Sequence, residues 1–437
     1  MSGRLWVWIV FLIVLTRFGA TVRAEVASRH FQSGEWGGYE VFQPKNTPQG
    51  LVFLFSPAGG PGAPEQAAIA ALTAKDLAVA LVDSRIYLTR VGGASPRTED
   101  CLELPGAVLW ASHWVQKELG FAAYQSAYLA GRGVGSSLVW TMLAQSSHQA
   151  FAAGFGADFS PQLPVGRPLC EIEPRGEPYQ RPLPKEHILG SPWQHLDTPG
   201  MTYGQWLAHG IQAHREAHIP NPAVVHDMPI IEVASHSQRD VLVVFYSGDG
   251  GWRDIDKALA EYLAGEGFAV LGVDALSYFW SALTPQQVGH DLIHLLAHYQ
   301  KAWNLRQVVL VGYSFGADIL PFAYNRLPPE VQRQVILLSL LAPGRAADFE
   351  IRVLGWLGAD PSAKALPLAP EIASIPKPRI QCLYGLDEAA RSLCTEPSMA
   401  TAEVISTSGS HHFDGDYATL GKRLFEGILR RLDTKNP

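Results

Sequence analysis

The second half of the chain alternates short, fully apolar runs with longer segments in which apolar residues recur at helical spacing. The helical segments cover residues 255–265 and 285–299. Strands that are apolar throughout and separated by helices are typical of a parallel sheet covered on both faces. The apolar runs predict strands at 241–246, 268–273, 307–311, 335–341, 380–384 and 402–406.

The first half repeats this layout. A strand at 51–56 enters a glycine-rich loop, as the strand at 241–246 does, and residues 77–83 parallel residues 268–274. After the third strand, the matching position holds Gly133 in the first half and Ser314 in the second. We therefore expect a tandem duplication with mostly parallel sheets, the alternative being convergence of two generic α/β patterns.

Residues 161–222 are rich in proline, glycine and histidine and show little periodicity. We interpret them as a linker and excursion, with a short helix at 203–217. The boundary between the copies is placed near Pro222. The expected division is therefore a first domain at 25–222 and a second at 223–437.

The strand at 307–311 runs into Gly312-Tyr313-Ser314-Phe315-Gly316 and then into a helical pattern. A strand-to-helix turn of this kind exposes a serine hydroxyl where a histidine can take its proton and backbone N–H groups can hold the oxyanion. The glycines lack a Cβ and so permit a tight turn. This context predicts Ser314 as the nucleophile of an α/β-hydrolase fold, whose degenerate copy is the first half. A glycine-rich turn without chemistry is the alternative.

In this fold an acid and then a histidine follow the serine along the chain. Asp387 and Glu388 follow the strand at 380–384, and the usual spacing from the glycine before them favours Glu388. A glycine-containing loop after the last strand carries His411 and His412. We predict His411 as the general base and His412 as a hydrogen-bond partner in the loop. The sequence does not show which carboxylate points at the histidine.

An oxyanion hole requires two convergent N–H groups. One is expected at Phe315, directly after the nucleophile, and the other in the glycine loop, at Gly248 or Asp249. The same loop could be a phosphate-binding turn, but it lacks the Lys-Ser/Thr ending of a P-loop. No cofactor is expected.

Three histidines, His290, His294 and His298, lie four residues apart on one expected helix. This spacing can ligate a metal ion, but no paired glutamate accompanies it as in H-E-x-x-H. The helix also carries an apolar face. We therefore interpret the histidines as a partly solvated polar stripe and expect no metal.

Composition excludes several classes of protein. With 437 residues, 47% hydrophobic and 17% charged, the chain can form two cores. Its formal net charge of −7 and the absence of a Lys/Arg run argue against a nucleic-acid partner.

The N-terminus has Arg4, an apolar stretch at 5–15 and a small-residue site at 22–24. This pattern predicts a signal peptide at 1–24, and an uncleaved membrane anchor is the alternative.

The four cysteines fit an oxidising compartment. Their positions favour one pair in each half, Cys101 with Cys170 and Cys382 with Cys394, the alternative being free thiols. The second pair would close the loop that carries Glu388. Neither pair has the spacing of a zinc site.

Three motifs in the second half carry a resemblance to a known family: Ser-Gly-Asp-Gly-Gly-Trp at 247–252, Gly-Tyr-Ser-Phe-Gly-Ala-Asp at 312–318 and Gly-Ser-His-His-Phe-Asp-Gly-Asp-Tyr at 409–417. With them the chain resembles the bacterial virulence protein VirJ/AcvB family, and its two-copy layout is similar to the longer, AcvB-type members. The resemblance implies a periplasmic α/β-hydrolase that removes the aminoacyl group from lysyl- or alanyl-phosphatidylglycerol at the membrane surface. It also implies a link to virulence and to type IV secretion.

The substrate implied by this resemblance has an ester carbonyl beside a free ammonium group. Asp249, Asp414 and Asp416 are candidates to hold that ammonium group. An esterase of other specificity is the alternative within the enzyme class. The rival class is an accessory binding protein, in which the first domain, lacking a nucleophile, docks onto the secretion apparatus or lipid.

Overall fold

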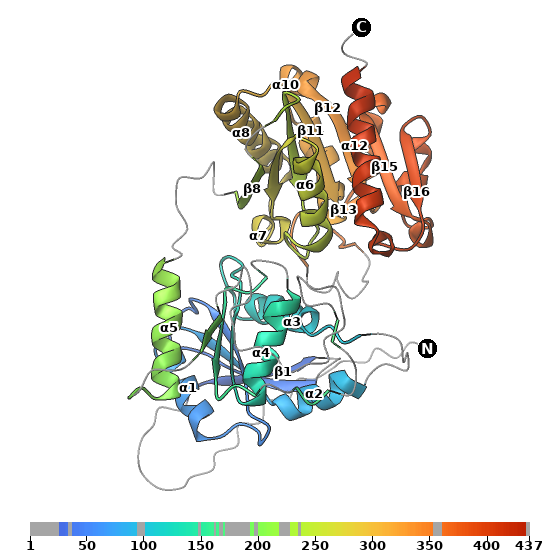
Figure 1. Ribbon diagram of the computed structural model, residues 1–437. Helices are drawn as coiled ribbons and strands as arrows, with labels where there is room; N and C mark the ends of the chain where they lie inside the picture. The colour runs from blue at the N-terminus through green and yellow to red at the C-terminus, as the bar shows by residue number, and fades with distance from the viewer. Residues whose placement is uncertain are drawn as a thin grey trace, which may run out of the picture.

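The computed structural model describes residues 26–33, 37–93, 101–146, 150–160, 163–165, 169–170, 193–195, 200–217, 228–234, 237–352 and 361–433. The expected signal peptide and the boundary at Pro222 lie outside these residues. The described part forms two α/β domains, each built on a seven-stranded, mostly parallel sheet (Figure 1). The predicted fold class is thereby confirmed.

The C-terminal sheet has the strand order β16-β15-β12-β11-β9-β10-β8. All neighbours are parallel except β8, which pairs antiparallel with β10 at one edge. The strands are β8 (Ile230–Ala234), β9 (Val241–Tyr246), β10 (Ala269–Val273), β11 (Gln307–Tyr313), β12 (Val335–Leu341), β15 (Ile380–Gly385) and β16 (Glu403–Thr407). A small hairpin pairs β13 (Ala346–Ala347) with β14 (Leu366–Pro367).

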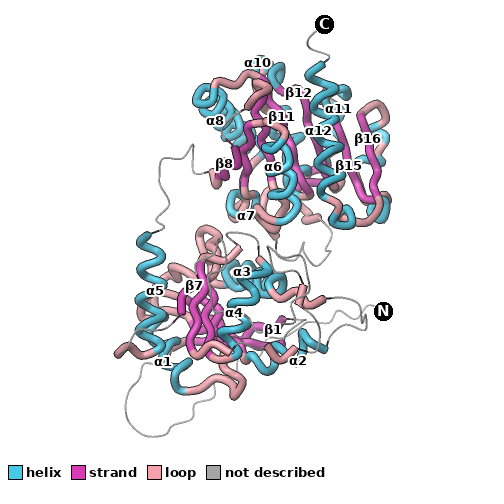
Figure 2. The backbone as a smooth tube through the Cα atoms, viewed as in Figure 1, coloured by secondary structure: helices cyan, strands magenta, loops and turns pink. Residues whose placement is uncertain are grey.

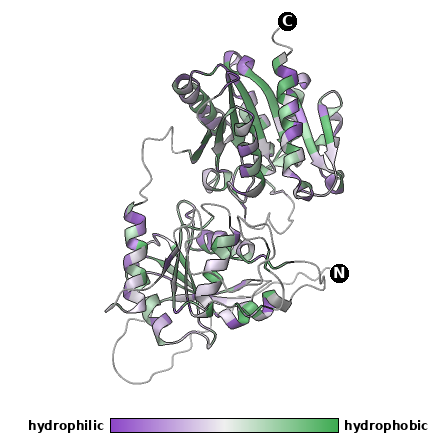
Figure 3. Cartoon of the chain, in the orientation of Figure 1, coloured by the Kyte–Doolittle hydropathy of each residue, from purple (hydrophilic) through white to green (hydrophobic). Residues whose placement is uncertain are grey.

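Successive residues of the central strands supply two separate cores, because side chains of a strand alternate between its faces. Leu242 and Val244 pack with α8 and α9 on one face, and Val243 and Phe245 pack with α6 and α12 on the other. Figure 3 shows the central strands as continuous hydrophobic bands between more mixed helices. The helices are α6 (Asp254–Gly265), α7 (Ala275–Tyr278), α8 (Pro285–Trp303), α9 (Phe315–Asn325), α10 (Pro329–Gln334), α11 (Leu368–Ala373) and α12 (Tyr417–Asp433).

The N-terminal sheet has the order β1-β2-β4-β3-β5-β6-β7. Its helices α3 and α4 cover one face, and α1 and α5 cover the other (Figure 2). The strands are β1 (Ser28–Ser33), β2 (Gly37–Phe42), β3 (Leu51–Phe55), β4 (Ala78–Val82), β5 (Tyr128–Arg132), β6 (Ala153–Ala157) and β7 (Trp193–His195). The helices are α1 (Ala63–Thr73), α2 (Ser84–Gly93), α3 (Pro105–Glu118), α4 (Val134–Gln145) and α5 (Tyr203–Ala217).

The two sheets correspond strand by strand: β2-β4-β3-β5-β6-β7 matches β8-β10-β9-β11-β12-β15. The loops after the first parallel strand also match. Ser56 Oγ accepts a hydrogen bond from Ser84 N at 3.1 Å, and Ser247 Oγ accepts one from Ala275 N at 2.9 Å. Agreement in strand order and in this buried contact supports the predicted duplication.

The structure corrects the interpretation of residues 161–222 as a linker. The short helix is present as α5 (Tyr203–Ala217), but β7 (Trp193–His195) pairs in parallel with β6 and extends the sheet. Trp193 is 3% exposed and belongs to the core. A three-residue strand among prolines carries too little periodicity to be recognised, and only its pairing with β6 defines it.

Helix α8 shows why the sequence fixes the start of a helix better than its end. Thr284 accepts from Gln287 N at 3.2 Å and the Gln287 side chain returns to Thr284 N at 2.9 Å, a capping box followed by Pro285. The expected end at Tyr299 is wrong by about one turn, because the helix continues to Asn304, where a left-handed residue (φ 55°) stops it.

Candidate active site

Ser314 lies at the sharp turn between β11 and α9. Its φ of 52° and ψ of −117° are torsions that residues with a Cβ rarely adopt. The turn needs glycine two residues later, because a Cβ on Gly316 would lie 2.3 Å from Tyr246 O. Ser314 N donates to Leu341 O at 2.8 Å, which ties the turn to the end of β12. The serine therefore stands at the carboxyl end of the sheet on a turn fixed by backbone contacts.

The structure brings Ser314, His411 and Glu388 together. His411 Nε2 is 2.7 Å from Ser314 Oγ, and His411 Nδ1 is 3.0 Å from Glu388 Oε2 and 3.1 Å from Oε1. Glu388 ends the 3₁₀ helix η4 (Leu386–Glu388) after β15, and His411 lies in the loop after β16. This order lets the imidazole take a proton from the serine while the carboxylate holds the other ring nitrogen.

The neighbouring candidates lie elsewhere. Asp387 is exposed, and its backbone N–H donates to Gly409 O at 3.0 Å, so it anchors the loop by its backbone. His412 is also exposed, with Nδ1 3.3 Å from the hydroxyl of Tyr313. That hydroxyl donates to His411 O at 3.2 Å. Tyr313 thus connects the turn before Ser314 to the histidine loop.

The electrostatics favour an ionised Glu388. Partial burial of the carboxyl opposes ionisation, but the hydrogen bond from His411 and the nearby charge of Arg391 outweigh it and lower the pKa of Glu388. The carboxylate is therefore negative at neutral pH. A negative partner on Nδ1 favours the tautomer that leaves Nε2 free to accept a proton.

The glycine loop after β9 closes over the serine. A Cβ on Gly248 would lie 3.7 Å from Ser314 Cβ, so the loop backbone passes close to the nucleophile. Gly248 and Asp249 line the same pocket as Ser314. Phe315 is the first residue of α9, and its ring packs at 5.0 Å against Phe279. All three predicted oxyanion-hole residues thus flank the serine or follow it directly.

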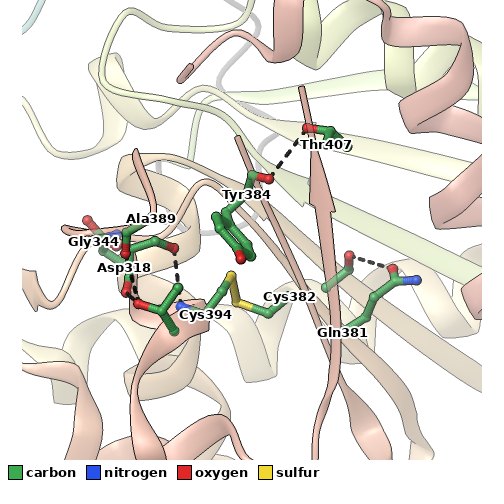
Figure 4. Close-up of a disulfide and its surroundings, with 11 residues drawn as sticks. Asp318, Gly344, Gln381, Cys382, Tyr384, Ala389, Cys394 and Thr407 are labelled. Atoms are coloured by element: carbon green, nitrogen blue, oxygen red, sulfur yellow. Dashed lines mark hydrogen bonds between the residues drawn. A yellow bond between two sulfur atoms is a disulfide. The ribbon is translucent and has the colours of Figure 1, made fainter. Parts of the chain in front are cut away.

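Both predicted disulfides are present, Cys101–Cys170 and Cys382–Cys394. Figure 4 shows the second one joining β15 to the 3₁₀ helix η5 (Leu393–Thr395), beyond the loop that carries Glu388. In the same region Thr395 Oγ1 donates to Ala389 O at 2.9 Å, and Gly344 N donates to Asp318 Oδ1 at 2.7 Å. The disulfide therefore joins a residue before Glu388 to a residue after it and closes the loop that carries the carboxylate. Disulfides indicate an extracytoplasmic protein.

A pocket of about 610 Å³ opens at Ser314 and has contributions from both domains. Asp249, Asp256, Arg253 and Arg391 give the C-terminal side charges of both signs. The opposite side consists of Leu109, Trp110 and His113 of α3, in the N-terminal domain. The sequence offered no signal for these three residues, since no motif marks them and their distance along the chain from Ser314 is large.

The three aspartates predicted to hold an ammonium group differ in whether they line this pocket. Asp249 lines the pocket, but Asp414 and Asp416 are not among its lining residues. Asp416 is exposed and accepts from Thr419 N at 3.1 Å at the start of α12. Asp256, which is 2% exposed, lines the pocket instead and was not anticipated. It lies on α6, where the helical pattern predicts only packing.

The aromatic residues after β10 and the histidines of α8 are not among the lining residues of this pocket. The aromatic residues after β10 are structural, with Phe279 buried and Trp280 3% exposed. His290 and His294 approach each other at 3.0 Å between Nε2 atoms on the exposed face of α8. Within the described ranges no cluster of three or more metal-ligating side chains occurs. No helix in the same ranges has both the length and the apolarity to cross a membrane.

The strand order, the serine turn and the carboxyl-end loops define the class as an α/β-hydrolase fold. Residues 240–432 match the family model described as "Bacterial virulence protein (VirJ)". The match runs from the start of β9 nearly to the end of α12, and so covers the sheet and the loops that carry Ser314, Glu388 and His411. No curated protein matches the chain.

Solved structures similar to the chain include two esterases. Est1E from Butyrivibrio proteoclasticus is 12% identical, with a TM-score of 0.34 over 44% of this chain and 88% of that one. The esterase Pf2001 from Pyrococcus furiosus is 15% identical, with a TM-score of 0.34 over 47% and 93%. Scores of this size add nothing to the fold assignment, which rests on the strand order and the turn at Ser314.

Proposed function

We propose that the protein is a serine hydrolase that cleaves the aminoacyl ester of lysyl- or alanyl-phosphatidylglycerol. The observation that carries the enzymatic part is the contact series from Glu388 through His411 to Ser314 Oγ, at 3.0 and 2.7 Å. The VirJ family match and the mixed charges of the pocket support the substrate. We further propose a periplasmic location with the signal peptide at 1–24, supported by the disulfides.

In the proposed reaction Ser314 Oγ attacks the ester carbonyl while His411 Nε2 takes the hydroxyl proton. The N–H groups of Phe315 and of Gly248 or Asp249 hold the developing oxyanion. His411 then gives its proton to the leaving alcohol, phosphatidylglycerol, and an aminoacyl-serine remains. Water, deprotonated by His411, attacks the acyl-serine, releases the amino acid and restores the serine. The chemistry needs no cofactor.

Charge complementarity supports an aminoacyl phospholipid over a neutral ester. Asp249 and Asp256 supply carboxylates for the ammonium group of the amino acid. Arg253 and Arg391 supply guanidinium groups for the phosphodiester, a group that arginine binds well. Asp256→Asn should therefore reduce kcat/KM more for alanyl-phosphatidylglycerol than for its N-acetyl derivative. Equal losses on both substrates would contradict this role of Asp256.

The test of the function is release of amino acid from lysyl- and alanyl-phosphatidylglycerol vesicles by the full-length protein. Ser314→Ala should lose about 10⁴-fold or more of the rate, as expected when a nucleophile acts as part of a unit. A fluorophosphonate that labels wild type but not Ser314→Ala would establish the nucleophile independently of the substrate. Labelling without amino-acid release would leave a serine esterase of other specificity.

A role as an accessory protein for type IV secretion is the second candidate. Gly133 stands at the nucleophile position of the N-terminal domain, so the turn there carries no serine. A binding role for this domain is compatible with hydrolysis in the other. Co-purification of secretion components with Ser314→Ala as well as with wild type would support it.

A further inference from the structure

Helix α3 belongs to the N-terminal domain but faces the active site of the C-terminal domain. Its residues Val108, Ala111 and Val115 are fully buried in their own domain's core. Leu109, Trp110 and His113, on another face of the same helix, line the pocket that contains Ser314. In Figure 1, α3 lies at the side of its domain nearest α7. The helix is thus packed on one face and presents another to the site.

Trp280 of the C-terminal domain fixes α3 in this position. Its Nε1 donates to Phe121 O at 2.9 Å, just beyond the end of α3. Lys117 Nζ lies 4.5 Å from the centre of the Trp280 ring and 3.3 Å from Glu350 Oε1. The Tyr124 ring adds a contact with the Trp280 ring, at 5.5 Å between centres. The ring contacts and the buried hydrogen bond of Trp280 are directional, so they define where α3 lies relative to Ser314.

The α3 side of the pocket differs in character from the opposite side. Leu109 and Trp110 are apolar, and His113 is 3% exposed. Burial, with a further contribution from the charge of Arg253, lowers the pKa of His113 well below its usual range, so the ring is neutral at pH 7. The side formed by the C-terminal domain carries Asp249, Asp256, Arg253 and Arg391. An ester that fits this pocket has charged groups on one side and hydrocarbon on the other.

We propose that α3 forms the wall of the active-site pocket that determines substrate specificity. Its residues Leu109 and Trp110 bind the hydrocarbon part of the ester that Ser314 attacks. The N-terminal domain then selects the substrate without taking part in the chemistry. This inference rests on the proposed function only as far as Ser314 is the nucleophile. It does not depend on the ester being an aminoacyl phospholipid.

The test compares Trp110→Ala with Trp303→Ala in the full-length protein. Trp303 is a matched control, because it is also partly buried but packs against Tyr299 at the end of α8. The measurement is the ratio of kcat/KM for hexyl acetate to that for ethyl acetate, two esters that differ only in the hydrocarbon of the leaving alcohol. Trp110→Ala should lower the ratio about tenfold, the size expected when an apolar pocket loses part of its contact. Trp303→Ala should leave the ratio at the wild-type value.

A ratio in Trp110→Ala equal to that of wild type would overturn the proposal. If these alkyl acetates turn over too slowly, the rates of Ser314 labelling by a short-chain and a long-chain fluorophosphonate give the corresponding ratio. If Trp110→Ala is labelled by the two reagents at the same relative rates as wild type, the proposed role of α3 is refuted and the serine mechanism is not. Absence of labelling in the wild type would refute the serine mechanism and the wall together.

Lys117→Ala provides a second, independent test. Lys117 does not belong to the pocket lining, but it binds Trp280 and Glu350 and so holds α3 in place. The variant should shift the same ratio in the same direction by a smaller factor. A purely structural role would lower kcat/KM for both esters equally, and that outcome would count against a positioned wall.

Discussion

Glu388→Gln isolates the charge that faces His411. The carboxylate lies 3.0 Å from Nδ1, and its side chain is 20% exposed. The substitution preserves the length of the side chain and an acceptor oxygen but removes the negative charge. During attack on the ester the imidazole becomes positive, with the two charge centres about 4 Å apart. At an effective dielectric constant of about 20, typical of partly buried pairs, their attraction is ~4 kcal/mol.

Loss of that attraction should lower kcat about a thousandfold, since each ~1.4 kcal/mol corresponds to a factor of ten. The assay is hydrolysis of p-nitrophenyl acetate by wild type, Glu388→Gln and Asp387→Asn, with folding checked by near-ultraviolet circular dichroism. Asp387 is the matched control, because it is the adjacent carboxylate and is exposed. If both variants lost activity equally, or if Glu388→Gln kept more than about a tenth of kcat, the electrostatic reasoning would be refuted.

Three further predictions concern stability. Replacing Cys382 and Cys394 together by alanine frees a loop of sequence separation 12 and should cost about 3 kcal/mol by loop entropy; urea unfolding measures this, and an unchanged midpoint would contradict it. The folded protein keeps His113 neutral, whereas the unfolded chain protonates this histidine below pH ~6.5. The free energy of unfolding should therefore fall by up to ~1.4 kcal/mol per pH unit below that value. Thermal melts at pH 7.5 and 5.5 should show this loss in wild type and not in His113→Gln. Gly316→Ala places a Cβ 2.3 Å from Tyr246 O and should destabilise the domain by about 3 kcal/mol or more; a wild-type melting temperature would show that the turn can relax.

The architecture could be predicted from the sequence because its central strands are buried on both faces. The strands at 241–246 and 335–341 have the predicted bounds. The ends of the other predicted strands differ from the observed ends by at most two residues. β8 escaped prediction because it is a partly exposed edge strand without a continuous apolar run. Local patterns report burial, whereas edge strands and short strands such as β7 are defined by their partners.

The candidate site was predictable as far as the turn and the loops, but not to the atom. Asp387 and Glu388 are adjacent, as are His411 and His412, so only the direction of each side chain distinguishes them. The loop conformation sets that direction, with Asp387 N bonded to Gly409 O. The structure places Glu388 and His411 beside Ser314, and their catalytic roles stay predictions. The contribution of α3 could not be foreseen, because it arises from the packing of one domain on the other around Trp280.

The turn at Ser314 has a counterpart in the same chain that shows what sets its shape. Gly133 has φ 59° and ψ −125°, close to the 52° and −117° of Ser314. A Cβ on Gly135 would meet Phe55 O at 2.3 Å, as one on Gly316 would meet Tyr246 O. The surrounding backbone therefore dictates the torsions whether or not a nucleophile is present. A side chain in such a conformation costs about 1–3 kcal/mol, which glycine avoids. The N-terminal domain thus serves as an internal reference for the conformational cost of holding a reactive serine, a cost that its own fold does not bear.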